Sequence, residues 1–228
     1  MHGSEAEVRI RDKAVALLRE ALPEARIIHE FDLFGVRMDL AAVTPEEIVL
    51  VEIKSERDKL DRLANQISFA TRIGGEVWVC FHEKWAKAID QRCHDQDMSV
   101  EIPIKGVPGG RTYAPNPLYI KGLTNCVLLS ESADTPLTPN RWTRDPRDRR
   151  HRAPRYDSRR LLGLIHKPEV LALAKPHGGK SRMTSWELID LCHEHMTGAQ
   201  IRRGVFAHIR AHDFFWADPA IPINPDQP

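Results

Sequence analysis

Two side chains of opposite charge stand two positions apart in the otherwise apolar segment "IVLVEIK", residues 48–54. The continuous apolar run predicts a buried strand. Residues i and i+2 of a strand project from the same face, so Glu52 and Lys54 should emerge side by side. An ion pair on a solvated edge strand is the alternative, and the apolar run disfavours it. Because a buried strand is an unfavourable place for charge, the pair is a candidate for chemistry.

A second carboxylate, Asp39, lies in "RMDL" on the preceding predicted strand, where it can stand beside Glu52. Two close carboxylates repel and raise each other's pKa unless a cation lies between them. A divalent metal ion with oxygen ligands satisfies this requirement and leaves room for a phosphate oxygen. Lys54 would then orient an attacking water or help to neutralise an attacked phosphate.

The elements that must position these residues follow from periodicity and turn signals. Apolar spacing predicts helices over residues 5–22, 58–73 and 82–95, and strands over 26–43, 48–55 and 76–81. The segment 26–43 reads as two strands around Gly35, which suggests a hairpin. The order α-β-β-β-α-β-α predicts an α/β fold with a mixed central sheet flanked by helices.

This ordered set of residues resembles the PD-(D/E)XK nuclease superfamily. Asp39 matches the first acid of the motif, and Glu52-Ile53-Lys54 fills its (D/E)-x-K element. Met38 stands where many members have proline. The resemblance implies a restriction-endonuclease-like core and a Mg²⁺ (or Mn²⁺) ion held by Asp39, Glu52 and the main-chain carbonyl of Ile53. It also implies that Lys54 supports the water nucleophile.

Many members add a glutamate from the first helix, for which Glu7 is the candidate and Glu30 the rival. The chain further resembles a branch carried by phages and prophages, with an R-x-D strand, E-I-K-S and a helix reading D-x-L-x-R-L-x-x-Q. Gln66 of that helix is expected to face the acids. Arg62 either contacts nucleic acid or is solvated. The residues that match are Arg37, Asp39, Glu52, Lys54, Ser55, Asp58, Leu60, Arg62, Leu63 and Gln66.

The remainder of the chain has a different composition. We divide it into a nuclease core (residues 1–100), a Gly/Pro-rich and then Arg-rich extension (101–160) and a small helical C-terminal region (161–228). Residues 141–160 hold nine arginines against three aspartates. This segment is either a charged linker or a nucleic-acid contact, in which Trp142 and Tyr156 could stack on bases. The proposed phosphate contacts are Arg147, Arg149, Arg150 and Arg152.

Three amphipathic helices are predicted after Leu161, as a DNA-binding module, a dimerisation surface or a brace for the core. The Pro-rich end of the chain is expected to be loosely ordered. The 228 residues carry a formal net charge of +1 and four cysteines without a C-x-x-C pair. This composition disfavours a disulfide scaffold and a structural zinc site. No apolar run is long enough to span a membrane, so a cytoplasmic protein of a bacterial or phage-infected cell is expected.

These observations predict a metal-dependent endonuclease that hydrolyses phosphodiester bonds in DNA, either nicking or structure-specific, in phage biology or DNA processing. The expected partner is DNA, with no membrane, and a homodimer is an open option. Two alternatives remain. One is a catalytically silent nucleic-acid-binding protein on a nuclease fold, and the other is an interaction protein that recruits an acidic partner through its arginines.

Overall fold

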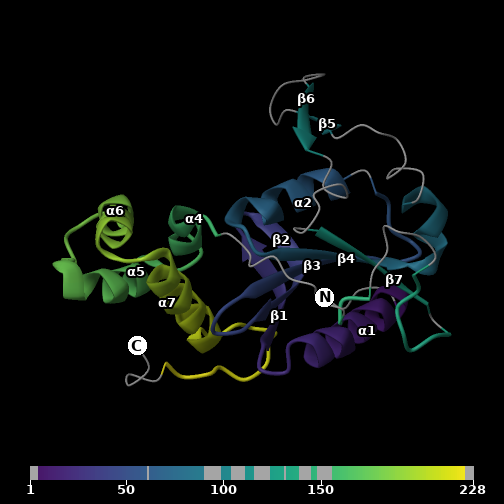
Figure 1. The fold of residues 1–228 in the computed structure, drawn as a ribbon, viewed down its shortest axis with the longest axis horizontal. Helices are drawn as coiled ribbons and strands as arrows, with labels where there is room; N and C mark the ends of the chain where they lie inside the picture. Colours follow the sequence, from purple (N-terminus) through teal and green to yellow (C-terminus); the bar gives the residue numbers. More distant parts are fainter. Residues whose placement is uncertain are drawn as a thin grey trace.

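The computed structural model describes residues 5–60, 62–89, 99–103, 111–115, 124–130, 132–138, 145–147 and 156–223. A five-stranded sheet with the order β1-β2-β3-β4-β7 lies at its centre (Figure 1). Its strands are β1 (Arg26–Leu33), β2 (Val36–Val43), β3 (Ile48–Lys54), β4 (Glu76–His82) and β7 (Thr124–Leu129). The helices are α1 (Glu5–Ala21), α2 (Leu63–Ala70), α4 (Ser158–Leu162), α5 (Lys167–Ala174), α6 (Ser185–His195) and α7 (Gly198–Ala211). The predicted α/β class with a mixed sheet flanked by helices is confirmed.

The first three strands form an antiparallel meander, and β4 and β7 continue the sheet in parallel with β3. The predicted hairpin around Gly35 joins β1 to β2. Phe34 and Gly35 both have positive φ angles, 55° and 82°. Such a two-residue turn matches the twist of the strands it connects.

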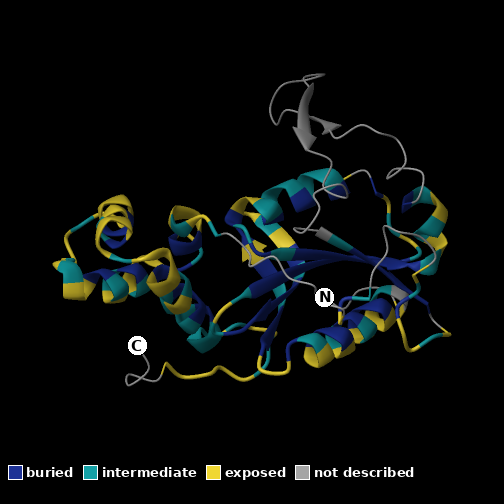
Figure 2. Cartoon of the chain, viewed as in Figure 1, coloured by how far each residue is buried: buried dark blue, intermediate teal, exposed yellow. Residues whose placement is uncertain are grey.

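The sheet separates two layers of apolar side chains, and β3 runs between them with all seven residues buried (Figure 2). Helix α1 covers one face, where Leu17 packs in a cluster with Val51 and Trp78. Helix α2 covers the other face, where Ile67 packs with Leu50. Because β3 is a central strand, Glu52 and Lys54 are not a solvated edge pair.

Helix α2 begins later than the periodicity predicts, at Leu63 rather than near residue 58. The cause is Asp58, whose Oδ2 accepts hydrogen bonds from Ser55 N–H at 2.7 Å and Ser55 Oγ at 2.6 Å. These bonds close a turn at the end of β3, a common role for aspartate. The helix predicted over 82–95 begins as a 3₁₀ turn, η2 (Glu83–Trp85), and is helical over 86–89, while residues 90–98 lie outside the described part.

The core sheet extends past the boundary placed at residue 100, because β7 pairs with β4 from Thr124 to Leu129. The sequence between β4 and β7 forms a second sheet, a hairpin of β5 (Ser99–Pro103) and β6 (Arg111–Pro115). Figure 1 shows this hairpin on the α2 side of the central sheet.

The C-terminal region forms four helices in place of the three predicted. The segment read as one helix from Leu161 is divided into α4 and α5, because His166 N–H donates to Glu169 Oε2 at 2.6 Å and starts a new helix with Pro168 in its first turn. These helices share the α2-side hydrophobic cluster of the sheet, through Leu161, Val170 and Phe206 among others. They therefore brace the core, which is one of the three roles considered for them.

The C-terminal segment beyond α7 is attached to the molecule. Trp216 O accepts from His29 N–H at 2.9 Å, and Asp218 N–H donates to Ile27 O at 2.9 Å. Arg26 is buried and donates to the carbonyls of Arg210 and His212, among others. The Pro-rich end predicted to be loosely ordered is residues 218–228, and the prediction is wrong at Asp218 and at Ile221, whose N–H donates to Arg210 O at 2.8 Å. Just before it, Ala217 forms a bridge with Ile28 at the edge of β1.

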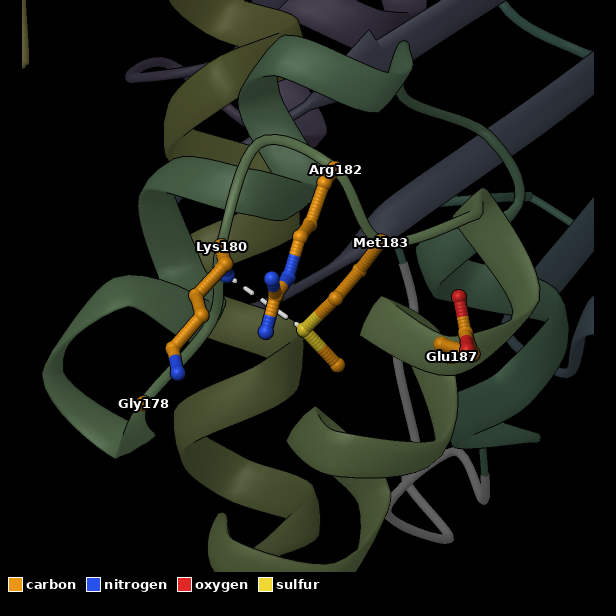
Figure 3. A pocket seen from close by; sticks show the side chains of 5 residues that line it. All are labelled: Gly178, Lys180, Arg182, Met183 and Glu187. Carbon is orange, nitrogen blue, oxygen red and sulfur yellow. Dashed lines mark hydrogen bonds between the residues drawn. The ribbon is translucent and has the colours of Figure 1, made fainter.

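A surface hollow of about 500 Å³ lies between η3 (Lys175–His177) and α6. Figure 3 shows Lys180 and Arg182 on the connecting loop, with Met183 Sδ accepting from Lys180 N–H at 3.3 Å. The lining residues are Gly178, Lys180, Arg182, Met183 and Glu187. None of them belongs to the sheet, so this hollow is separate from the acidic residues on β2 and β3. No helix in the described ranges is long and apolar enough to cross a membrane.

Candidate active site

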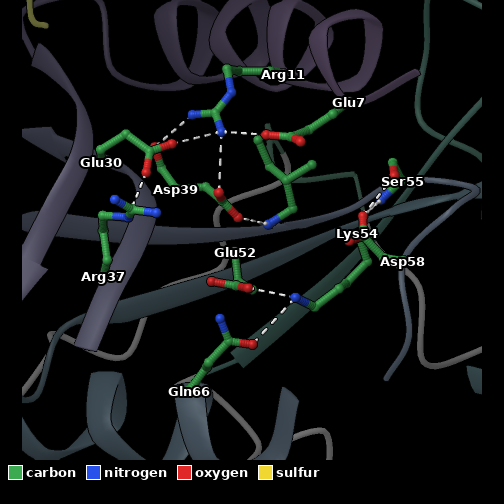
Figure 4. Close-up of polar contacts among 11 residues, drawn as sticks. Glu7, Arg11, Glu30, Arg37, Asp39, Glu52, Lys54, Ser55, Asp58 and Gln66 are labelled. Carbon is green, nitrogen blue, oxygen red and sulfur yellow. Dashed lines mark hydrogen bonds and ion pairs between the residues drawn. The ribbon is translucent and has the colours of Figure 1, made fainter. Parts of the chain in front are cut away.

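Asp39 and Glu52 lie where β2 and β3 diverge (Figure 4). The last pair in the register between these strands is Leu40 with Val51. At the next position, the Asp39 carboxylate takes the place of a main-chain acceptor, because its Oδ2 accepts from Ile53 N–H at 2.7 Å. The structure therefore brings the two predicted acids to the same gap in the sheet.

Glu52, Lys54 and Gln66 form the second half of this cluster. Lys54 Nζ donates to Glu52 Oε1 at 2.6 Å and to Gln66 Oε1 at 3.2 Å. Gln66 comes from α2, and its side chain points toward the Glu52 carboxylate (Figure 4). Gln66 therefore lies beside Lys54 and Glu52, and its role in the site stays a prediction.

The pKa of Glu52 is raised to about 7, first by burial and then by the negative charge of Asp39, while Lys54 and Gln66 oppose the rise. Burial also raises the pKa of Asp39, against the opposing effects of Ile53 N–H and Arg11. The Glu52 side chain is only 3% exposed. Its Oε2 is buried without a hydrogen-bond partner of normal geometry among the described residues. A cation at this oxygen would lower the raised pKa of Glu52 and would give the buried oxygen a partner.

Arg11 of α1 is a member of the cluster that the sequence reasoning missed. Its Nη2 lies 2.9 Å from Glu7 Oε1, 3.1 Å from Glu30 Oε1 and 3.1 Å from Asp39 Oδ1. Its Nη1 donates to the main-chain carbonyl of Asp39 at 2.9 Å. The available signal was the spacing of Glu7 and Arg11, which places them on one face of a helix.

Glu30 occupies an unusual backbone conformation for a strand residue, with φ at 55°. A non-glycine residue in this region costs on the order of 1–3 kcal/mol. The conformation directs the Glu30 carboxylate between two guanidinium groups, those of Arg11 and of Arg37, whose Nε lies 2.6 Å from Glu30 Oε2. Charge-assisted hydrogen bonds of this kind offset such a cost.

The predicted ligand set fits a divalent ion in part. Asp39, Glu52 and the Ile53 carbonyl come from adjacent strands, and Glu52 Oε2, which has no hydrogen-bond partner within the described residues, suits a hard cation. The two additional candidates, Glu7 and Glu30, are both engaged by Arg11. Within the described parts of the chain, no three His, Cys, Asp or Glu side chains gather as metal ligands. Arg11 engages Asp39 as well, so Glu52 supplies the carboxylate oxygen that has no hydrogen-bond partner among the described residues.

Among the predicted nucleic-acid contacts, Arg62 and Arg147 lie within the described residues. Arg62 is exposed directly before α2. Arg147 pairs with Asp145 at 2.5 Å and with Glu20 of α1 at 2.9 Å. Arg149, Arg150 and Arg152 lie outside the described residues, as does Trp142.

Tyr156, which was considered for base stacking, packs edge-to-face on Phe206. Its hydroxyl oxygen accepts from Ile48 N–H at 3.2 Å. The Tyr156 side chain therefore packs within the fold, where it connects α7 to the start of β3.

Residues 3–102 match the family model described as Bacteriophage P4 protein cII. No curated protein and no solved structure matches the chain. The matched range runs from the start of α1 to beyond β4 and includes every acid, arginine and lysine of the cluster described above. This part of the chain, less than half of its length, is thus similar to a phage protein family.

Proposed function

We propose that the protein is a metal-dependent endonuclease that hydrolyses phosphodiester bonds in DNA. The observation that carries the proposal is Glu52, a buried acid next to Asp39 and Lys54 with a pKa raised to about 7. Its Oε2 has no hydrogen-bond partner among the residues that the structure describes. Perturbed carboxylates beside a fixed cation are typical of catalytic sites. The similarity of residues 3–102 to a phage family suits a role in phage biology.

Asp39, Glu52 and the Ile53 carbonyl would hold Mg²⁺ or Mn²⁺ in this proposal. The bound ion would supply Lewis-acid polarisation of the phosphate. Asp39 is oriented for this role from two sides, because Ile53 N–H and Arg11 each hold one of its oxygens. Glu52 would be ionised in the loaded site, since a cation favours the charged form of a carboxylate.

Lys54 would orient the water that attacks the phosphate and would neutralise charge that develops on the phosphate oxygens. Its ammonium group is held by Glu52 and Gln66, at 2.6 and 3.2 Å, so its position is fixed before substrate arrives. Gln66 thereby acts through Lys54. An ammonium cannot be a metal ligand, so Lys54 and the two acids have separate roles.

The test is a cleavage panel with Mg²⁺ and Mn²⁺ on supercoiled, linear, single-stranded and branched DNA. Asp39→Asn, Glu52→Gln and Lys54→Met should each reduce cleavage at least about 100-fold, the usual contribution of such groups. Asp39→Asn and Glu52→Gln should also lose Mn²⁺ binding by calorimetry, whereas Lys54→Met should keep it. Glu194→Gln, which changes an exposed carboxylate on α6, is the matched control and should behave as wild type.

The same panel separates the alternatives. Wild-type rates in the Asp39 and Glu52 variants would refute the assignment of these residues. DNA binding that depends on salt, without cleavage of any substrate, would favour a catalytically silent nucleic-acid-binding protein. If the protein neither binds nor cleaves any of these DNA substrates, the result would favour an interaction protein.

A further inference from the structure

We propose that Arg11 is a positioning residue and the resident cation of the acidic cluster, which holds Asp39 in place and keeps the affinity for divalent metal low. This inference rests on the proposed function, because it concerns the same site. Its basis is the set of contacts around one guanidinium group, shown in Figure 4.

Arg11 donates hydrogen bonds to two groups of Asp39, its carboxylate and its main-chain carbonyl. Nη2 binds the carboxylate oxygen Oδ1 at 3.1 Å, and Nη1 binds the main-chain carbonyl at 2.9 Å. The second carboxylate oxygen is held by Ile53 N–H. The planar guanidinium therefore fixes both the backbone and the side chain of Asp39 without any metal, a geometry that a lysine ammonium cannot reproduce.

The charge on Arg11 is permanent and enclosed. The residue is 4% exposed, and a guanidinium does not lose its proton in a protein. The ring of Trp216 lies 5.2 Å from the guanidinium carbon and covers it. Trp216 is itself bound to β1 through its carbonyl, which accepts from His29 N–H, so the C-terminal segment supports the cluster from the far end of the chain.

Three carboxylates surround the Arg11 guanidinium, and one of them, Glu30, also pairs with Arg37. Glu7 and Glu30 come from α1 and β1, and Asp39 from β2. In the metal-free protein Arg11 offsets their mutual repulsion, whereas a divalent ion bound by Asp39 would be repelled by the same guanidinium. Removing the charge should therefore destabilise the metal-free protein and strengthen metal binding at the same time.

The experiment uses Arg11→Met, which keeps much of the side-chain volume but removes the charge and its donors. We expect Mn²⁺ to bind at least about tenfold more tightly, since a unit charge in contact with a ligand carboxylate is worth a kcal/mol or more. We also expect the thermal midpoint without metal to fall. Adding Glu7→Gln to this variant should restore part of that loss, because it removes one of the three carboxylates whose mutual repulsion Arg11 offsets.

Arg11→Lys is the conservative variant, because it keeps the positive charge but lacks the two Nη donors of the planar guanidinium. It should retain the weak Mn²⁺ affinity of the wild type, and its thermal midpoint without metal should fall less than that of Arg11→Met. This variant therefore tests the charge-holding role even if Arg11→Met fails to fold. Equal or weaker Mn²⁺ binding in Arg11→Met, with metal-dependent cleavage intact in the wild type, would refute the proposal that the Arg11 charge keeps the metal affinity low, and it would leave the proposed function standing. Failure of the wild type and of both variants to bind Mn²⁺ would instead refute the proposed function. Rescue by Glu7→Gln would still support the charge-holding role.

Discussion

Glu52 lies where burial and a neighbouring negative charge act in the same direction. Both favour the protonated carboxyl, and the Lys54 ammonium at 2.6 Å reduces the effect without cancelling it. A carboxyl buried on a central strand is destabilising by itself when one oxygen has no hydrogen-bond partner, as holds for Glu52 in the described part of the chain. Its presence is understandable if the ionised form has a ligand to bind.

The raised pKa of Glu52 predicts a pH dependence in the metal-free protein. Because the pKa is about 7 in the folded state against 4.5 as the ordinary value, the folded state binds more protons between these pH values. The contribution of Glu52 to stability is therefore most favourable below pH 4.5 and is lost as pH rises toward 7. Glu52→Gln should remove this loss.

The measurement is urea unfolding of wild type and Glu52→Gln at pH 5 and pH 7.5 in the presence of a chelator. The variant should gain stability relative to wild type at the higher pH. A difference between the two proteins that is the same at both pH values would contradict the assigned pKa.

The elements around the cluster are tied together by a segment that has no regular structure. Residues 216–218 pair with β1, and the Trp216 indole stacks on the His29 imidazole, with ring centroids 4.1 Å apart. Asp218 accepts from Ile27 N–H and binds Arg19 of α1. Edge strands are commonly protected by a covering segment, and here the cover also reaches Arg11.

Protonation of His29 should weaken this attachment. Burial, followed by the positive charge of Arg11, lowers the pKa of His29 to about 4 from the ordinary value of 6.5. The folded state thus favours the neutral ring, whose contribution to stability is complete above pH 6.5 and is lost as pH falls toward 4. This dependence has the opposite sign to that of Glu52, so wild type alone cannot separate them.

His29→Phe keeps an aromatic ring against Trp216 but cannot be protonated. Denaturant unfolding at pH 7 and pH 4.5 should show that the variant loses less stability on acidification than wild type. His193→Phe, which changes an exposed histidine on α6, is the matched control. An equal loss in His29→Phe and wild type would show that the buried imidazole does not titrate as expected.

At the scale of the whole molecule, one hydrophobic cluster runs from the α2 face of the sheet into the C-terminal helices. The C-terminal region is therefore part of the folded unit that carries the cluster of acids. A role in DNA binding or in dimer formation stays a prediction. DNA contact by the arginine-rich segment also stays a prediction. Arg147 pairs with Asp145 and Glu20, and the other three proposed contacts lie outside the described residues.

If the segment follows a DNA backbone, the remaining three arginines should contribute a log–log salt slope of roughly −2.7, about −0.9 per phosphate contact. Replacing Arg149, Arg150 and Arg152 with alanine should flatten the slope on duplex DNA by that amount and leave Mn²⁺ binding unchanged. Arg147→Ala is the control and should leave the slope unaltered. Titrations of labelled DNA from about 50 to 200 mM salt provide the measurement, and parallel slopes for the triple variant and wild type would exclude the DNA contact.

The sequence by itself determined the local elements near the candidate site and two of its acids. The apolar run through Glu52 indicated a buried strand, Gly35 indicated the hairpin, and the pattern of α1 indicated its helix, because each of these is encoded in neighbouring residues. The pairing of Lys54 with Glu52 followed from the two-residue period of a strand.

Only the tertiary structure decided how distant segments complete the site. Arg11 reaches Asp39 across 28 positions of sequence, Trp216 covers Arg11 from the other end of the chain, and β7 joins the sheet after a long connection. Periodicity reports which face of an element is apolar, but it does not report which distant polar partner a buried guanidinium will find. Such partners are selected by the packing of the whole core, because every buried charge must be matched where the elements meet.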